Sequence, residues 1–174
     1  MNFTSSYLVL VVGGLLEVVY ADFFRNDFLP VGHVRTDAIL QKNCLSDHVH
    51  TFYGPPLLYP EVAFDDLRNS DPALSSGNIE ENQSLYWHPT VYNVADDGKM
   101  TLREPEMVTV YYNWIPGSTT AFPPGFRMIT PGEEVFDTEG KMSGESEMEL
   151  SISFQSCWDG INLDSTGSKS CCLS

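Results

Sequence analysis

The chain has 174 residues, of which 42% are apolar and 12% aromatic, and its formal net charge is −15. This length suits one domain of ordinary size, and the composition excludes a chain that is disordered throughout. The excess of Asp and Glu argues against nucleic acid as a partner, because binding to a phosphate backbone depends on clustered Lys and Arg.

The first 21 residues have the character of a secretion signal. Their apolar run, residues 7–16, is too short to span a bilayer, for which about 20 residues are needed. Val19-Tyr20-Ala21 follows and fits cleavage by signal peptidase after Ala21. The alternative is a buried N-terminal helix or strand. We expect a cleaved signal, an extracellular location and no membrane segment once the signal is removed.

After this signal, Gly and Pro interrupt the chain at short intervals and leave little room for long helices. A hairpin turn is expected at residues 96–99, between strands at Tyr92 and Met107, and a short helix within residues 60–69. The segments between the breaks that favour strands are 49–53, 85–94, 107–114 and 150–154. They predict a mostly β fold, an antiparallel β-sandwich or jelly roll with long loops.

The cysteines and one asparagine are candidates for covalent modification in a secreted protein. Cys44 and Cys157 could form a disulfide that closes a long loop, worth about 4–5 kcal/mol in the chain-entropy model. The alternative is two thiols with other partners or none. Cys171 and Cys172 are adjacent, and neighbouring cysteines rarely bond each other. Asn82 begins a glycosylation sequon, Asn-Gln-Ser.

The histidines suggest a metal site. In an extended strand His48 and His50 would lie on one face, and two imidazoles are half of a site for a divalent transition metal. A third ligand could come from His88 or His33, whereas Asp47 would face the other way. In the alternative interpretation, one imidazole bonds to backbone and the other packs or faces solvent.

Aromatic side chains suggest a sugar-binding surface, because flat rings with polar edges can stack on a pyranose face. The alternative is the core of a β-sandwich, and in alternating strands one face can pack while the other binds. A rigid turn before Arg127 aims its guanidinium at a carboxylate or at a ligand anion. The remaining candidate ligand-binding residues are Trp87, Tyr111, Tyr112, Trp158 and Asp159.

Six segments, taken in order, resemble one family. They are residues 47–54, 66–68, 86–89, 111–112, 121–128 and 156–165. Together they are similar to domain of unknown function nineteen-ninety-six, over about residues 35–165. The resemblance implies an extracellular, mostly β domain, which in fungi often accompanies carbohydrate-binding or cell-wall modules. It implies no reaction.

The chain departs from the family after residue 165. Members usually continue with a second histidine-bearing stretch, whereas residues 166–174 form an atypical tail here. We therefore expect the domain, residues 22–165, to be incomplete at its C-terminus, through an incomplete gene model or an alternative splice product.

Three functions are compatible with the sequence. The first is a secreted protein associated with extracellular or cell-wall polysaccharide. The second is a structural wall or matrix protein without a catalytic site. The third is a metal-dependent extracellular enzyme that uses the histidine cluster.

Overall fold

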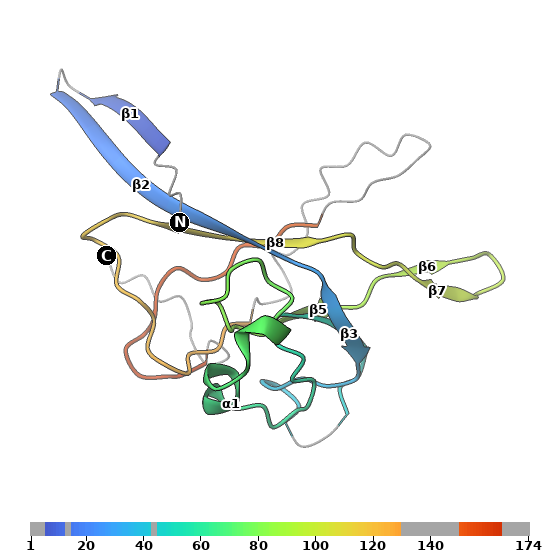
Figure 1. Ribbon diagram of the computed structural model, residues 1–174. Coiled ribbons are helices and arrows are strands. Elements are labelled where there is room, and N and C mark those ends of the chain that lie inside the picture. The colour runs from blue at the N-terminus through green and yellow to red at the C-terminus, as the bar shows by residue number, and fades with distance from the viewer. Residues whose placement is uncertain (1–5, 13–14, 43–44, 130–149, 165–174) are drawn as a thin grey trace. The chain divides into compact units, whose positions relative to one another are not determined.

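A computed structural model describes residues 6–12, 15–42, 45–129 and 150–164 (Figure 1). The chain divides into two compact units, Met1–Ala121 and Phe122–Ser174. All the named helices and strands belong to the first unit. The boundaries 22–165 for one domain stay a prediction.

The first sheet has the strand order β1-β2-β8 and is antiparallel throughout. Its strands are β1 (Ser6–Val12), β2 (Leu15–Phe28) and β8 (Val108–Trp114). The long strand β2 changes partner along its length: it pairs with β1 up to Ala21 and with β8 from Asp22 onward. The change of partner therefore coincides with the predicted cleavage site.

The second sheet has the order β3-β4-β5, also antiparallel. It consists of β3 (Pro30–Val34), β4 (His50–Tyr53) and β5 (Tyr86–Pro89). All four residues of the central strand β4 are buried. The run of Val, Thr, Phe and Tyr that predicted this strand suits a central position, where β-branched and aromatic side chains pack on both faces.

The two sheets are joined through aromatic side chains. Leu29 alone separates β2 from β3, and the Phe28 ring at the end of β2 lies 5.0 Å from the Tyr86 ring of β5. The Tyr86 hydroxyl in turn bonds to the hydroxyl of Tyr112 on β8. Buried apolar residues of the core are Phe28, Ala38, Ile39, Phe52, Tyr53 and Val62. The expectation of a mostly β fold with antiparallel sheets is confirmed.

The predicted hairpin is present, but its second arm differs from the expectation. β6 (Tyr92–Val94) pairs with β7 (Met100–Leu102), not with a strand at Met107. The turn closes over residues 95–99, where the backbone N–H of Gly98 donates to the carbonyl of Ala95. Pro105 follows and has no N–H for a ladder, which accounts for an arm that ends earlier.

The helical content is small, as expected. Helix α1 (Phe64–Arg68) lies within the predicted residues 60–69, and its Asp66 carboxylate accepts a hydrogen bond from the N–H of Ala63. A single 3₁₀ turn, η1 (Pro72–Leu74), is capped by Asp71. Among the helices in the described part of the chain, none has the length and apolar character needed to cross a lipid bilayer.

One predicted strand is wrong. Residues 150–154 alternate in sequence, but no strand forms there, and the side chains of Leu150, Ile152 and Phe154 are all exposed. Within this segment Ser151 alone makes a β-bridge, so regular alternation does not by itself produce a continuous strand.

Candidate functional site

The four histidines surround the sheet β3-β4-β5 but lie on different faces of it. His33, Thr51 and His88 are directly opposite one another across the three strands, so their side chains share one face. His50 precedes Thr51 and therefore points to the other face, together with Phe52. Neither His33 nor His88 is thus on the face of the sheet that carries His50.

His48 and His50 do converge, as predicted from their spacing. Their ring centroids are 4.4 Å apart, although β4 begins only at His50 and His48 lies in the bend before it. His50 is buried, and its Nδ1–H donates to the carbonyl of Thr36 at 2.8 Å. This bond leaves the lone pair of Nε2 available, which is the arrangement found in many histidine ligands of metals.

The environment of His50 favours its neutral form. Burial lowers the pKa of His50 most strongly, and the nearby imidazole of His48 lowers it further. The Thr36 hydrogen bond and the charge of Asp37 act in the opposite direction without cancelling the effect of burial.

On the other face, both ring nitrogens of His88 and of His33 have partners. Tyr53 donates its hydroxyl to Nε2 of His88 at 2.8 Å, and Nδ1–H of His88 donates to the carbonyl of Pro89. His33 donates Nε2–H to the Glu104 carboxylate, 3.0 Å away, and accepts the Thr51 hydroxyl at Nδ1. The two histidines therefore tie strands β3, β4 and β5 together.

These positions leave the metal site with two imidazoles. His48 and His50 supply half of a transition-metal ligand set, whereas His33 and His88 are on the opposite face with both nitrogens engaged. No group of three or more His, Cys, Asp or Glu side chains that could hold a metal ion occurs in the described residues. The metal centre stays a prediction.

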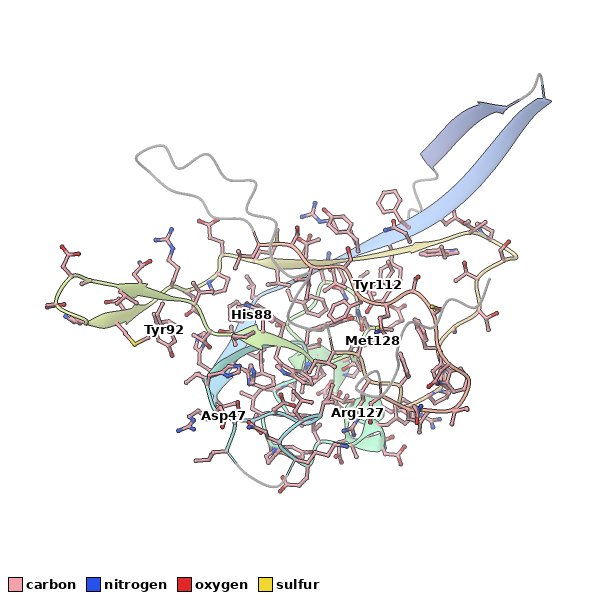
Figure 2. The ribbon with its side chains drawn as sticks, turned by 180° about the vertical axis from the view of Figure 1, so that it is seen from behind. Asp47, His88, Tyr92, Tyr112, Arg127 and Met128 are labelled. Carbon is pink, nitrogen blue, oxygen red and sulfur yellow. The ribbon has the colours of Figure 1, made fainter. Side chains whose placement is uncertain are left out.

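The two other candidates near this sheet have different surroundings. Trp87 lies on the His50 face and stacks on Phe52, with ring centroids 5.6 Å apart. It is half-buried, so its ring contributes mainly to packing. Asp47 is exposed, and its backbone N–H donates to the side chain of Gln41. Figure 2 labels Asp47 and His88.

Tyr111 and Tyr112 are adjacent on β8 and point to opposite faces. Tyr112, labelled in Figure 2, stacks on Phe24 of β2 with ring centroids 4.5 Å apart, and its hydroxyl bonds to that of Tyr86. Burial, reinforced by the neighbouring Tyr86, raises the pKa of Tyr112 above its usual range. Tyr111, by contrast, is 59% exposed. Sequence alternation on β8 thus separates a packing tyrosine from an accessible one.

The accessible tyrosine belongs to a face that the sequence did not identify. We call this surface the ribbon face: it is the exposed side of the paired strands β2 and β8 and includes Phe23, Arg25, Asp27, Thr109, Tyr111 and Asn113. Tyr111 is directly opposite Arg25, and Thr109 is opposite Asp27. Residues 22–28 do not alternate regularly between apolar and polar side chains, and their partner strand could not be deduced from the sequence.

The polar groups of the ribbon face are held in place. Nε–H of Arg25 donates to Asp27 Oδ1 at 2.8 Å, and the Thr109 hydroxyl donates to the same oxygen at 2.7 Å. Partial burial opposes ionisation of Asp27, but these two hydrogen bonds and the charge of Arg25 outweigh it, so the pKa of Asp27 is lowered. The pKa of Arg25 is raised by the same pair.

The second unit contains three predicted ligand-binding residues in a local framework. The backbone N–H of Arg127 donates to the carbonyl of Leu163 at 2.8 Å. Asp159 accepts hydrogen bonds from the backbone N–H groups of Ile161 and Asn162, both at 2.9 Å. Trp158 donates its indole N–H to the carbonyl of Asn162. The structure therefore gives Trp158 and Asp159 a role in closing this turn.

The candidate modification sites are only partly described. Cys44, Cys171 and Cys172 lie outside the described residues, and Cys157 is half-buried, so the disulfide stays a prediction. Asn82 is described: its Nδ2–H donates to the Tyr86 hydroxyl at 3.0 Å, and its Oδ1 accepts from the N–H of Ser84. In the fold Asn82 thus anchors the Tyr86–Tyr112 contact, and its glycosylation stays a prediction.

Comparison with known proteins gives one match. No curated protein and no solved structure matches the chain significantly. The family model described as "Domain of unknown function (DUF1996)" matches residues 37–143, more than half of the chain. The matched range begins after β3, includes β4, β5 and β8, and ends before the turn at Trp158. The chain therefore belongs to the DUF1996 family of domains of unknown function.

Proposed function

We propose that this protein is secreted and binds extracellular or cell-wall polysaccharide through the ribbon face. The observation that carries the proposal is the exposed ring of Tyr111, which lies beside the fixed Arg25–Asp27 pair. An accessible aromatic face with ordered polar neighbours suits a pyranose ring, which offers apolar C–H groups on its face and hydroxyls at its edge.

The opposite side of the same strands supports this assignment. There the side chains of Phe24, Phe28 and Tyr112 pack against other aromatic rings. Since the inward side already supplies the contacts that hold β2 and β8, Tyr111 is not needed for packing. A large aromatic side chain that is left accessible in this way is a candidate for ligand contact.

The strand pairing of β2 supports secretion. Cleavage after Ala21 would remove β1 together with the part of β2 that pairs with it. All the pairs between β2 and β8, from Asp22↔Trp114 to Phe28↔Val108, would remain. Signal removal would therefore leave the ribbon face intact. N-terminal sequencing of the protein collected from the medium of a secreting host should begin at Asp22.

Binding is tested with the variant Tyr111→Ala. Truncating a central aromatic contact costs about 2 kcal/mol, or about 30-fold in affinity. Affinity electrophoresis of the secreted chain in gels that contain soluble polysaccharides measures this loss. Tyr59→Ala is the matched control, because Tyr59 is also exposed but lies outside the ribbon face, in the loop before α1. Equal binding by wild type and Tyr111→Ala would refute the proposal.

A structural wall or matrix protein without a catalytic site is the second candidate. It is favoured by the hydrogen bonds that engage both ring nitrogens of His33 and of His88, since the bonds to Thr51 and Tyr53 join neighbouring strands. In that case the histidines serve stability alone. Failure of the wild-type chain to bind any wall polymer in the same gels would favour this candidate over the first.

A further inference from the structure

The charges of the ribbon face suggest the class of polysaccharide that it would accept. Among the described residues that form the ribbon face, Arg25 and Asp27 carry the formal charges, and they are paired with each other. Both side chains remain accessible, with 46% of Arg25 and 24% of Asp27 exposed. A ligand would therefore meet a paired cation and anion, not an unpaired cation.

The other polar groups of this face are uncharged. They are the hydroxyls of Tyr111 and Thr109 and the amide of Asn113. Neutral hydroxyls and amides exchange hydrogen bonds readily with sugar hydroxyls, whereas a carboxylate or sulfate is best recognised by an unpaired Arg or Lys. The local chemistry thus favours an uncharged ligand.

The charge of the whole chain acts in the same direction. A protein with a net charge of −15 repels a polyanion at long range, and this repulsion extends over about a Debye length, or about 8 Å, at physiological salt. A polyuronate approaching the ribbon face would meet this repulsion, and the cation among the described residues of that face, Arg25, is already paired with Asp27.

We propose that the ribbon face selects neutral polysaccharides, such as glucans or mannans, over polyuronates, because Asp27 occupies the guanidinium of Arg25. This inference deepens the proposed function and rests on it. Asp27 is then a specificity-determining residue, since it cancels the charge that would otherwise attract an acidic polymer.

The variant Asp27→Asn tests the inference. An amide oxygen at position 27 can still accept the hydrogen bonds from Arg25 and Thr109, so the strand pairing is retained, but the guanidinium is no longer neutralised. Affinity electrophoresis in gels containing a soluble β-glucan, a galactomannan or polygalacturonate compares it with wild type. A matched control is Asp96→Asn, which removes the same charge from an exposed position in the β6–β7 turn.

We expect wild type to bind a neutral polymer and to show no retardation in polygalacturonate. Asp27→Asn should gain affinity for polygalacturonate by about 1.5- to 5-fold per contacted uronate, the range for exposed charge pairs. The gain should disappear at high salt and be absent in Asp96→Asn. If Asp27→Asn is poorly folded by circular dichroism, the wild-type chain alone decides: stronger retardation in the neutral gels than in polygalacturonate supports the inference, and the reverse order overturns it.

The outcomes separate the inference from the proposed function. Tighter binding of wild type to polygalacturonate than to either neutral polymer would overturn the inference and leave polysaccharide binding standing. An equal gain in Asp27→Asn and Asp96→Asn would also overturn it, because the effect would then come from net charge alone. Binding of wild type to none of the polymers would overturn both.

Discussion

The sheet β3-β4-β5 and the pair β2–β8 use similar residues for different purposes. Both are rich in Tyr, Trp, Phe and polar side chains, and in both the side chains along each strand point alternately to the two faces of the sheet. In the first, polar groups are bonded across the strands, Thr51 to His33 and His88 to Tyr53. In the second, one face packs and the other presents Tyr111 to solvent. Residue type alone therefore does not distinguish a site from a structural network.

The largest contrast between the two regions is expected in the cost of removing an aromatic ring. Phe52 is 1% exposed and contacts the rings of His50 and Trp87, so Phe52→Ala should lower the free energy of unfolding by about 3–5 kcal/mol. Tyr111→Ala should change it by less than about 0.5 kcal/mol. Urea denaturation of the two variants measures both values. Similar losses would mean that Tyr111 is a packing residue.

The turn that ends β4 should be nearly as sensitive. Gly54 has φ of 104°, and a Cβ there would lie 2.3 Å from the carbonyl oxygen of Ser84. Backbone strain and steric overlap should together cost Gly54→Ala about 3 kcal/mol.

Gly98→Ala is the control for that variant. Gly98 also has a positive φ, 81°, but no atom lies within 4 Å of the position of the added Cβ. The strain alone should cost about 1 kcal/mol. Equal urea midpoints for the two alanine variants would contradict the close approach of residues 54 and 84.

A smaller effect is expected when a single hydroxyl is removed. Tyr53→Phe deletes the donor to Nε2 of His88 and leaves that nitrogen half-buried without a partner, at a cost of about 1–2 kcal/mol. Tyr111→Phe removes an exposed hydroxyl and should be nearly neutral. A double-mutant cycle with His88→Ala isolates the Tyr53–His88 coupling. A coupling of zero would exclude this hydrogen bond as a source of stability.

The smallest expected effect depends on pH. Because the pKa of His50 is lowered from 6.5 in the fold, the unfolded chain binds a proton at this position before the folded chain does. His50 should therefore contribute a loss of stability as the pH falls below 6.5.

His50→Gln removes that contribution. Its free energy of unfolding, measured in urea at about pH 7.5 and about pH 5.5, should fall less than that of wild type, since the other titrating groups are common to both. The charged groups that act on the pKa of His50 are His48, Asp37 and, from the other face of the sheet, His88, so His48→Gln serves as a control for the neighbouring imidazole. Parallel pH profiles for wild type and His50→Gln would contradict a buried, neutral His50.

Part of the fold follows from local sequence patterns. Strands β4, β5, β6 and β8 and helix α1 all lie within predicted segments, because residues with strand preference stand between Pro and Gly breaks. The segment 150–154 has an equally regular pattern and no strand. Alternation within a segment therefore does not decide whether a strand forms, because pairing also depends on residues elsewhere in the chain.

In the candidate site, too, some features follow from local sequence and others depend on distant residues. Proximity of His48 and His50 could be predicted from a spacing of two residues, and their ring centroids are 4.4 Å apart. The engagement of His33 and His88 could not, because their partners Glu104 and Tyr53 are 71 and 35 residues away in the sequence. The Arg25–Asp27 pair was local in sequence, but its exposure depended on which face of β2 packs.

The sequence by itself determined the family, the mostly β character of the chain and its acidic charge, because these depend on motifs, local preference and composition. Tertiary structure alone decided which side chains are accessible. β2 pairs with β8 through partners more than 80 residues apart, such as Asp27 and Thr109, and that pairing buries Tyr112 while it exposes Tyr111. Local preferences select a strand, but only its neighbours determine which of its two faces is buried.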